Sequence, residues 1–68
     1  METSRTRLNA KEQLIVKLIS EGMTSPRIAE ELCLSLPAIK WYRKRIRAKF
    51  NATTTVEAIR KAIEQGYL

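Results

Sequence analysis

The sequence contains no histidine and no aspartate, and all seven of its acidic residues are glutamates. It has only two glycines and no glycine-rich phosphate-binding loop. Without an imidazole or a paired-carboxylate site, the chain lacks the side chains that most acid–base catalysis uses. An aspartyl phosphate cannot form on it, so the receiver of any phosphorelay lies elsewhere or on another chain. We expect no enzyme, no catalytic residue, no cofactor and no small-molecule ligand.

Cysteine is almost absent as well. Cys33 is the only cysteine, which excludes a disulfide scaffold or a zinc finger within one chain, so no metal site is expected. Because it lies between Leu32 and Leu34, we expect Cys33 to be a small buried apolar side chain. No apolar run approaches the roughly 20 residues of a membrane span, and no signal-peptide pattern opens the chain. The expected location is the cytoplasm.

Positive charge is what the sequence has in excess, with 13 lysines and arginines against seven glutamates and a net charge of +6. Such a chain attracts polyanions, nucleic acid first and anionic membranes second, although charge for solubility alone is an alternative. The 68 residues form one domain at most, which buries only roughly 60% of its unfolded surface. The apolar fraction of 44% is that of a folded chain.

Apolar residues recur with a helical period throughout, which predicts an all-α fold. The expected helices span about residues 10–21, 25–33, 35–50 and 54–65. Capping boxes at Asn9–Glu12 and Thr54–Glu57 open the first and last helices. The terminators are Gly22, Asn51 and Gly66. The expected core-facing residues of the first three helices are Leu14, Ile15, Leu18, Ile19, Ile28, Ala29, Leu32, Ile39, Tyr42, Ile46 and Phe50.

The third predicted helix carries six of the 13 cations within ten consecutive positions, and no acidic residue lies between Ser35 and Val56. At about 100° per residue, the side opposite the apolar one consists of Pro37, Lys40, Trp41, Lys44, Arg45 and Ala48, flanked by Arg43, Arg47 and Lys49. A solvated face usually mixes signs. We therefore expect a partner outside the chain to compensate this charge, as a phosphate backbone does. The Trp41 indole is expected to face a groove or a partner, a buried core indole being the alternative.

A short helix, a turn at Cys33-Leu34-Ser35-Leu36 and a longer cationic helix indicate a helix-turn-helix, whose second helix enters the major groove of DNA. Leu34 is expected to fill the gap between these helices. The N–H groups near Thr24 and Ser25 would receive a phosphate. Residues 1–7 are polar, so we expect a flexible segment or linker remnant before a DNA-binding domain at 8–68, which favours a piece of a longer regulator.

Three other partners compete with duplex DNA at this point. As a helical protein-interaction module, the chain would place its basic third helix in an acidic groove of a partner protein. A steep linear fall of the binding constant with salt concentration on a log–log plot would instead indicate that the helix contacts phosphates. RNA recognition favours aromatic platforms, and the chain has only four aromatic residues. Binding to a membrane surface needs an exposed apolar face, but Ile39, Ile46 and Phe50 are needed for the core.

At ungapped spacing, the chain from Leu8 to Leu68 resembles the LuxR/GerE-type helix-turn-helix family. The matching landmarks are Leu8, Glu12, Leu18-Ile19, Gly22, Ile28-Ala29, Leu32, Leu34-Ser35, Ile39-Lys40, Ile46, Lys49, Ala58, Ala62 and Gly66. The resemblance implies a four-helix domain at the C-terminus of bacterial transcription regulators, whose third helix reads double-stranded DNA and whose fourth supports dimerisation. It makes RNA polymerase a further candidate partner. The run 40–45 is similar to a subset of response-regulator output domains.

The matched positions make Lys40, Trp41, Lys44, Ser35, Arg43, Arg47 and Lys49 candidate contacts, and the other candidates come from the helical wheel and the start of the second helix. The candidates for base reading are Lys40, Trp41, Lys44 and Arg45. The candidates for phosphate contacts are Thr24, Ser25, Arg27, Ser35, Arg43, Arg47 and Lys49. The family usually or often has other residues where this chain has Ala38, Tyr42, Arg45, Asn51 and Thr55. The first three alter the reading helix, so the target sequence cannot be inherited from the family.

The fourth predicted helix has an apolar shoulder beside its core side. Ala58, Ile59 and Ala62 can face the core, and the shoulder consists of Val56, Arg60, Ile63 and Tyr67. This shoulder either widens the core stripe or forms a two-fold contact between identical chains. In the second case, two third helices would enter successive major-groove segments about 34–36 Å apart. Because the patch is small, we expect a weak homodimer that DNA stabilises.

Overall fold

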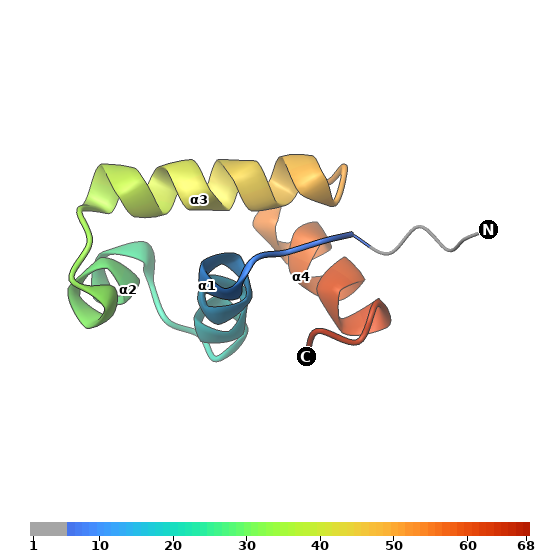
Figure 1. Cartoon of the computed structure of the whole chain (residues 1–68), viewed down its shortest axis with the longest axis horizontal. Coiled ribbons are helices and arrows are strands. Elements are labelled where there is room, and N and C mark those ends of the chain that lie inside the picture. The colour runs from blue at the N-terminus through green and yellow to red at the C-terminus, as the bar shows by residue number, and fades with distance from the viewer. Residues whose placement is uncertain (1–5) are drawn as a thin grey trace.

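The computed structural model describes residues 6–68, and these residues form four helices and no strand. The helices are α1 (Ala10–Ser20), α2 (Ser25–Leu32), α3 (Leu36–Lys49) and α4 (Thr55–Glu64). The all-α prediction is confirmed, and the predicted boundaries agree closely with the observed ones. Figure 1 shows α3 lying across one side of the molecule with the other helices beneath it, so the outer side of α3 is left uncovered.

Each helix begins at a side chain that accepts a hydrogen bond from the backbone N–H three residues later. These residues are Asn9, Thr24, Ser35 and Thr54. The capping box at Asn9 is confirmed, because Glu12 Oε1 accepts from the Asn9 N–H at 2.9 Å in return. Only one half of the second predicted capping box is present, the hydrogen bond from the Glu57 N–H to the Thr54 hydroxyl. Glu57 Oε1 accepts instead from Thr53, which offers it both its N–H, at 3.0 Å, and its hydroxyl, at 3.2 Å.

The core lies between α3 and the helices beneath it. Its buried apolar residues are Leu8, Ile15, Val16, Ile28, Ala29, Ile39, Ile46, Phe50, Ala58 and Ala62. The predicted inward faces of α2, α3 and α4 are therefore confirmed, with Leu32, Tyr42 and Ile59 half-buried against this core. On α1 the prediction is confirmed for Ile15, Leu18 and Ile19, which are buried or packed against the core, and is wrong for Leu14. Leu14 is 41% exposed, whereas Val16 and Glu12 are fully buried, because the inward stripe runs Glu12–Ile15–Val16–Ile19.

The turn between α2 and α3 differs from the sequence prediction at its first residue. Cys33 is exposed rather than buried, because it ends α2 in the left-handed conformation, with φ = 56°. That conformation directs the chain so that the next residue, Leu34, packs against the core as predicted. The predicted terminators of the other helices are confirmed, since Gly22, Asn51 and Gly66 all have positive φ.

The beginning of the described chain lies beside the end of α4. Thr6 N–H donates to Gln65 Oε1 at 2.7 Å, and the Tyr67 hydroxyl donates to the Thr6 carbonyl. The next carbonyl, that of Arg7, accepts from Lys49 Nζ at 3.1 Å. The rest of the segment expected to be flexible, residues 1–5, lies outside the described residues. Within residues 6–68, no helix combines the length and apolar character needed to cross a membrane.

Candidate nucleic-acid interface

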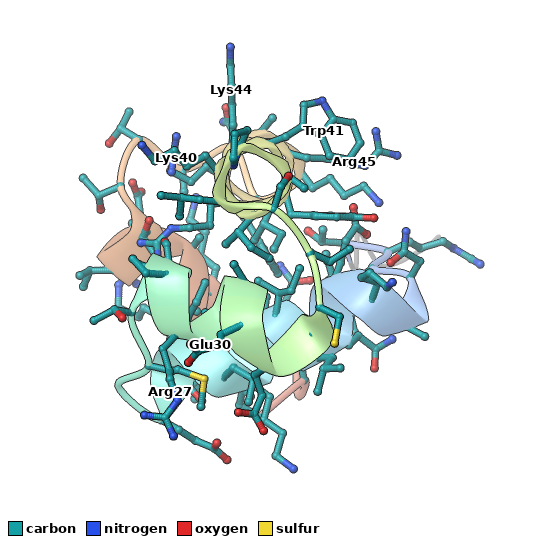
Figure 2. The ribbon with its side chains drawn as sticks, turned by 90° about the vertical axis from the view of Figure 1, so that its left-hand side faces the viewer. Arg27, Glu30, Lys40, Trp41, Lys44 and Arg45 are labelled. Carbon is teal, nitrogen blue, oxygen red and sulfur yellow. The ribbon has the colours of Figure 1, made fainter. Side chains whose placement is uncertain are left out.

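The outer side of α3 has the composition that the helical wheel predicts. Its residues are all exposed, and they are Pro37, Lys40, Trp41, Lys44, Arg45 and Ala48. Trp41 is 54% exposed, so the alternative of a buried core indole is wrong. Figure 2, which looks along α3, shows Lys40, Trp41 and Lys44 projecting away from the rest of the molecule. This face is cationic with one large aromatic ring.

Two of the α3 cations are compensated within the chain, contrary to the sequence argument. Glu12 of α1 is fully buried, and its Oε2 accepts from Arg45 Nε at 2.8 Å. Its Oε1 accepts from Lys49 Nζ at 2.7 Å. Sequence reasoning assigned Glu12 only to a helix cap, because its partners are 33 and 37 residues away and no local spacing points to them.

The environment of Glu12 favours its charged form. Burial raises the pKa of this carboxyl, but hydrogen bonds from Lys49 Nζ, the Asn9 N–H and Arg45 together lower it further than burial raises it. The net pKa therefore lies below the ordinary value of 4.5. Glu12 is an anion at neutral pH, and it orients two cations at the edge of α3.

The other two arginines of α3 are bound to hydroxyl groups at helix starts. Arg43 donates from Nη1 to Ser25 Oγ at 2.8 Å and from Nη2 to Thr55 Oγ1 at 3.1 Å. Arg47 Nη1 also reaches Thr55 Oγ1, at 3.5 Å. The N-termini of α2 and α4 thus meet at the arginines of α3. Helix N-termini and guanidinium groups both attract phosphate. The cluster brings together three predicted phosphate contacts, Ser25, Arg43 and Arg47. It also includes Thr55, which the sequence had shown only as a departure from the family.

Lys40 and Lys44 are the α3 cations that remain. Among residues 6–68, no acidic or hydrogen-bonding partner is placed against either ammonium group, and both are exposed. Their charges therefore lie side by side on one face of α3 without local compensation. A ligand of high negative charge density would remove this repulsion.

The remaining phosphate candidates are less closely grouped. Thr24 Oγ1 accepts from the Arg27 N–H at 3.4 Å, and Ser35 Oγ accepts from the Ala38 N–H at 3.2 Å, so both hydroxyls act as helix caps. The Arg27 side chain lies 4.0 Å from Glu31, and Figure 2 places it on the opposite side of the molecule from Lys44. The structure does not bring Arg27 together with the cationic face, and a phosphate contact by it stays a prediction.

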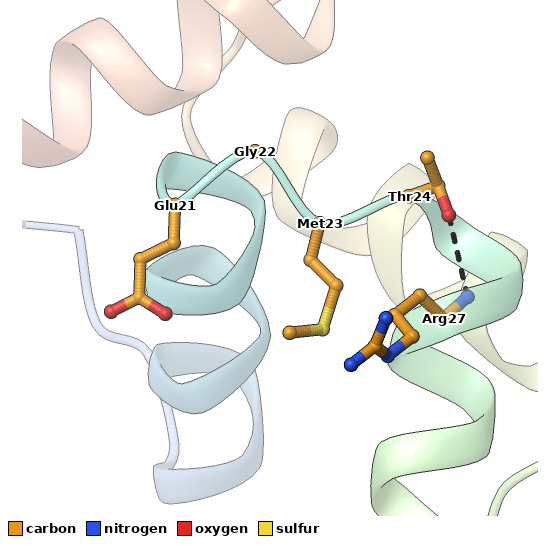
Figure 3. Close-up of a pocket in the computed structure, with 5 residues that line it drawn as sticks. All are labelled: Glu21, Gly22, Met23, Thr24 and Arg27. Carbon is orange, nitrogen blue, oxygen red and sulfur yellow. Dashed lines mark hydrogen bonds between the residues drawn. The ribbon is translucent and has the colours of Figure 1, made fainter.

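A shallow hollow of about 290 Å³ lies at the connection between α1 and α2. Figure 3 shows Met23 lying between Glu21 and Arg27, beside Gly22 and the cap Thr24. Its volume is at the lower limit of small-molecule sites, and it has no cluster of polar groups converging on one point. Within residues 6–68, no group of histidine, cysteine or glutamate side chains could hold a metal ion.

The four residues of the α4 shoulder do not form one continuous apolar surface. Val56 is 79% exposed and Ile63 is 55% exposed, while Arg60 pairs with Glu64 at 2.9 Å. Tyr67 belongs to the core side. Its ring packs edge-to-face on Phe50 at 6.4 Å, and its hydroxyl accepts from the Leu8 N–H at 3.2 Å. The wider core stripe thus accounts for Tyr67, and the free apolar surface of α4 is limited to Val56 and Ile63.

The family model described as bacterial regulatory proteins, luxR family, matches residues 6–62. The chain is 29% identical over its whole length to the HTH-type transcriptional regulator AlkS of Alcanivorax borkumensis, of which it covers 8%. Over 52 residues, 76% of the chain, it is 35% identical to BvgA of Bordetella pertussis, named a virulence factors putative positive transcription regulator, and covers 25% of that protein.

A solved structure matches the fold. The VqmA–ligand–DNA complex from Vibrio cholera contains a chain that aligns with 98% of this one at a TM-score of 0.85 and 25% identity. The alignment covers 29% of the VqmA chain. The residues described here therefore span a minor part of each of these relatives.

Proposed function

Because the chain belongs to the luxR family of bacterial regulatory proteins, we propose that residues 8–68 form a domain that binds double-stranded DNA sequence-specifically and regulates transcription. The observation that carries this proposal is the pair of uncompensated ammonium groups, Lys40 and Lys44, beside the exposed Trp41 on the uncovered side of α3. Lysine donates to guanine O6 and N7 in the major groove. The DNA complex of the structurally similar VqmA supports the same partner.

In the proposed complex, α3 lies in the major groove and the arginine cluster contacts the backbone. The guanidinium of Arg43 and the N-terminus of α2 lie at one flank of α3, where they would bind phosphate and fix the register of the helix on the duplex. Lys40 and Lys44 on the outer side would then read base edges. We further propose a cytoplasmic location, output from a response regulator and contact with RNA polymerase as the context of this domain.

Selection of bound sequences from a pool of random duplexes tests the proposal. We expect an enriched site, and we expect log Kd to rise linearly with log salt, because several phosphates displace counterions. Because each phosphate contact contributes about −0.9 to the slope of log affinity against log salt, the measured slope gives the number of contacts. Indifference to duplex DNA at low salt would contradict the proposal, and binding to an acidic protein groove in its place would favour the protein-interaction alternative.

We also propose that two chains associate weakly on DNA through α4. The supporting surface is small and consists of Val56 and Ile63, so the free domain is expected to be a monomer. Sedimentation with and without a duplex carrying an inverted repeat is expected to give a monomer and a complex of two chains per duplex. Val56→Ser is expected to reduce the second binding step, with the exposed Leu14→Ser as a matched control. One chain per inverted-repeat duplex would contradict this proposal.

A further inference from the structure

The cationic face of α3 is not flat. A hollow of about 270 Å³, open to solvent, is lined by Trp41, Lys44, Arg45 and Ala48. These residues follow one another at helical spacing on the outer side of α3, and most of the surface they present to the hollow is apolar. Figure 2 shows that Lys44 extends outward beyond the indole of Trp41. The hollow therefore combines an apolar floor with a free ammonium group at its rim.

The Trp41 indole that lines the hollow contacts two neighbouring side chains. The Arg45 guanidinium carbon lies 5.4 Å from the centroid of the Trp41 ring, a cation–π contact. The Tyr42 ring also contacts it edge-to-face, with the two ring centroids 5.0 Å apart. Arg45 is itself held by the buried carboxylate of Glu12. The indole is thus connected to the core of the domain, and little side-chain entropy is lost when a ligand binds it.

The chemistry of this hollow selects one kind of group in the major groove. Most groups at the base edges there are hydrogen-bond donors or acceptors, and the apolar exception is the methyl group at C5 of thymine. A methylated cytosine carries the same methyl at the same ring carbon. An apolar floor between Trp41 and Ala48 fits that methyl, while Lys44 at the rim can donate to the O6 or N7 of an adjacent guanine.

We propose that this hollow binds the C5-methyl group of a pyrimidine, and that Arg45 is a positioning residue that holds Trp41 rather than a reader of bases. The inference rests on the proposed function, since it concerns the DNA face of the same domain. It assigns Glu12 an indirect part in specificity, through the Arg45 guanidinium that it orients. It also separates Arg45 from Lys44, which the sequence analysis grouped together.

Removal of single methyl groups from the selected duplex tests the hollow. Each thymine is replaced in turn by deoxyuridine, which lacks only the C5-methyl, and each cytosine in turn by 5-methylcytosine. If thymine is the source, one uracil substitution per half-site weakens binding about fourfold, the factor for burying one methyl group. If methylated cytosine is the source, one methylation strengthens binding by a similar factor. The effect is expected to vanish in Trp41→Ala and to persist in Glu31→Ala, an exposed residue of α2 that pairs with Arg27 and lies outside the hollow.

The positioning role of Arg45 has an independent readout, because Trp41 is the only tryptophan. In Arg45→Ala, we expect acrylamide to quench Trp41 fluorescence more strongly in the free protein, and we expect the methyl effect to shrink at the same position. Loss of discrimination at a different base pair would show instead that Arg45 reads a base. Duplex binding with no sensitivity to any methyl group would overturn the inference alone, whereas absence of duplex binding would overturn the proposed function.

Discussion

Replacement of Glu12 by alanine is expected to lower the free energy of unfolding by about 3 kcal/mol. Removal of one partner from a buried ion pair costs on the order of 3–5 kcal/mol when the other charge stays buried. The cost here lies at the lower end, because the Arg45 side chain is 46% exposed and can be rehydrated. For a chain of 68 residues with a total stability of roughly 3–10 kcal/mol, this loss is about a third or more of the total. Urea denaturation followed by circular dichroism measures it.

A matched control for this substitution is Glu31→Ala. Glu31 lies 4.0 Å from Arg27, and both side chains are more than half exposed. Exposed pairs of this kind contribute at most about 1 kcal/mol, and those at i and i+4 of a helix about 0.3–0.5 kcal/mol. We therefore expect little change in the urea midpoint. If the two alanine variants lost the same stability, the buried position of Glu12 would not be what makes its ion pairs important.

The pH dependence of the same site has a definite sign. Since the folded-state pKa of Glu12 is lowered, its contribution is complete above the ordinary value of 4.5 and is lost as pH falls through the lowered pKa. Glu12→Gln keeps the shape of the capping residue but carries no charge. The stability difference between wild type and this variant is expected to be constant near neutral pH and to shrink below pH 4.5. Glu57, whose pKa is also lowered, first of all by the hydrogen bond from the Thr53 N–H, is present in both proteins and cancels.

The sequence predicted the parts of the structure that depend on neighbours along the chain. Caps such as Asn9 and terminators such as Gly22 lie within a few residues of the groups they satisfy, so helix boundaries were predicted well. The exposure of Lys40, Trp41 and Lys44 followed from the helical period of α3 alone. Local geometry is sufficient for each of these inferences.

The parts that were missed depend on contacts between distant segments. The buried position of Glu12 on α1 is explained only by its hydrogen bonds with Arg45 and Lys49 of α3, which packs against α1. Cys33 was placed in the core because its neighbours are leucines, but the left-handed turn directs it outward. The cluster at Arg43 likewise requires the starts of α2 and α4 to converge. Four of the six cations that the sequence assigned to an external partner therefore also join the helices.

This distinction leaves Lys40 and Lys44 for DNA recognition, and Lys44, which lines the hollow beside Trp41, is the cation whose removal should affect it most. Lys44→Ala is expected to weaken binding to the selected site by about 1–3 kcal/mol, roughly 5- to 150-fold in Kd, and to relax the preference at one base pair. No other described residue pairs with the Lys44 ammonium, and the side chain is exposed, so the free energy of unfolding should change by less than about 0.5 kcal/mol. Fluorescence anisotropy with single-base variants of the duplex measures both affinity and preference.

Arg47→Ala provides the contrast, because Arg47 lies at the flank of α3 and reaches Thr55 rather than the outer face. Its loss is expected to weaken binding to all duplexes by about the same factor and to reduce the salt slope by about 1, as expected for one phosphate contact. Lys44→Ala should change the base preference, and Arg47→Ala should not. Identical profiles for the two variants would mean that the outer side of α3 does not read bases, and the division of its cations into base-reading and phosphate-binding groups would be wrong.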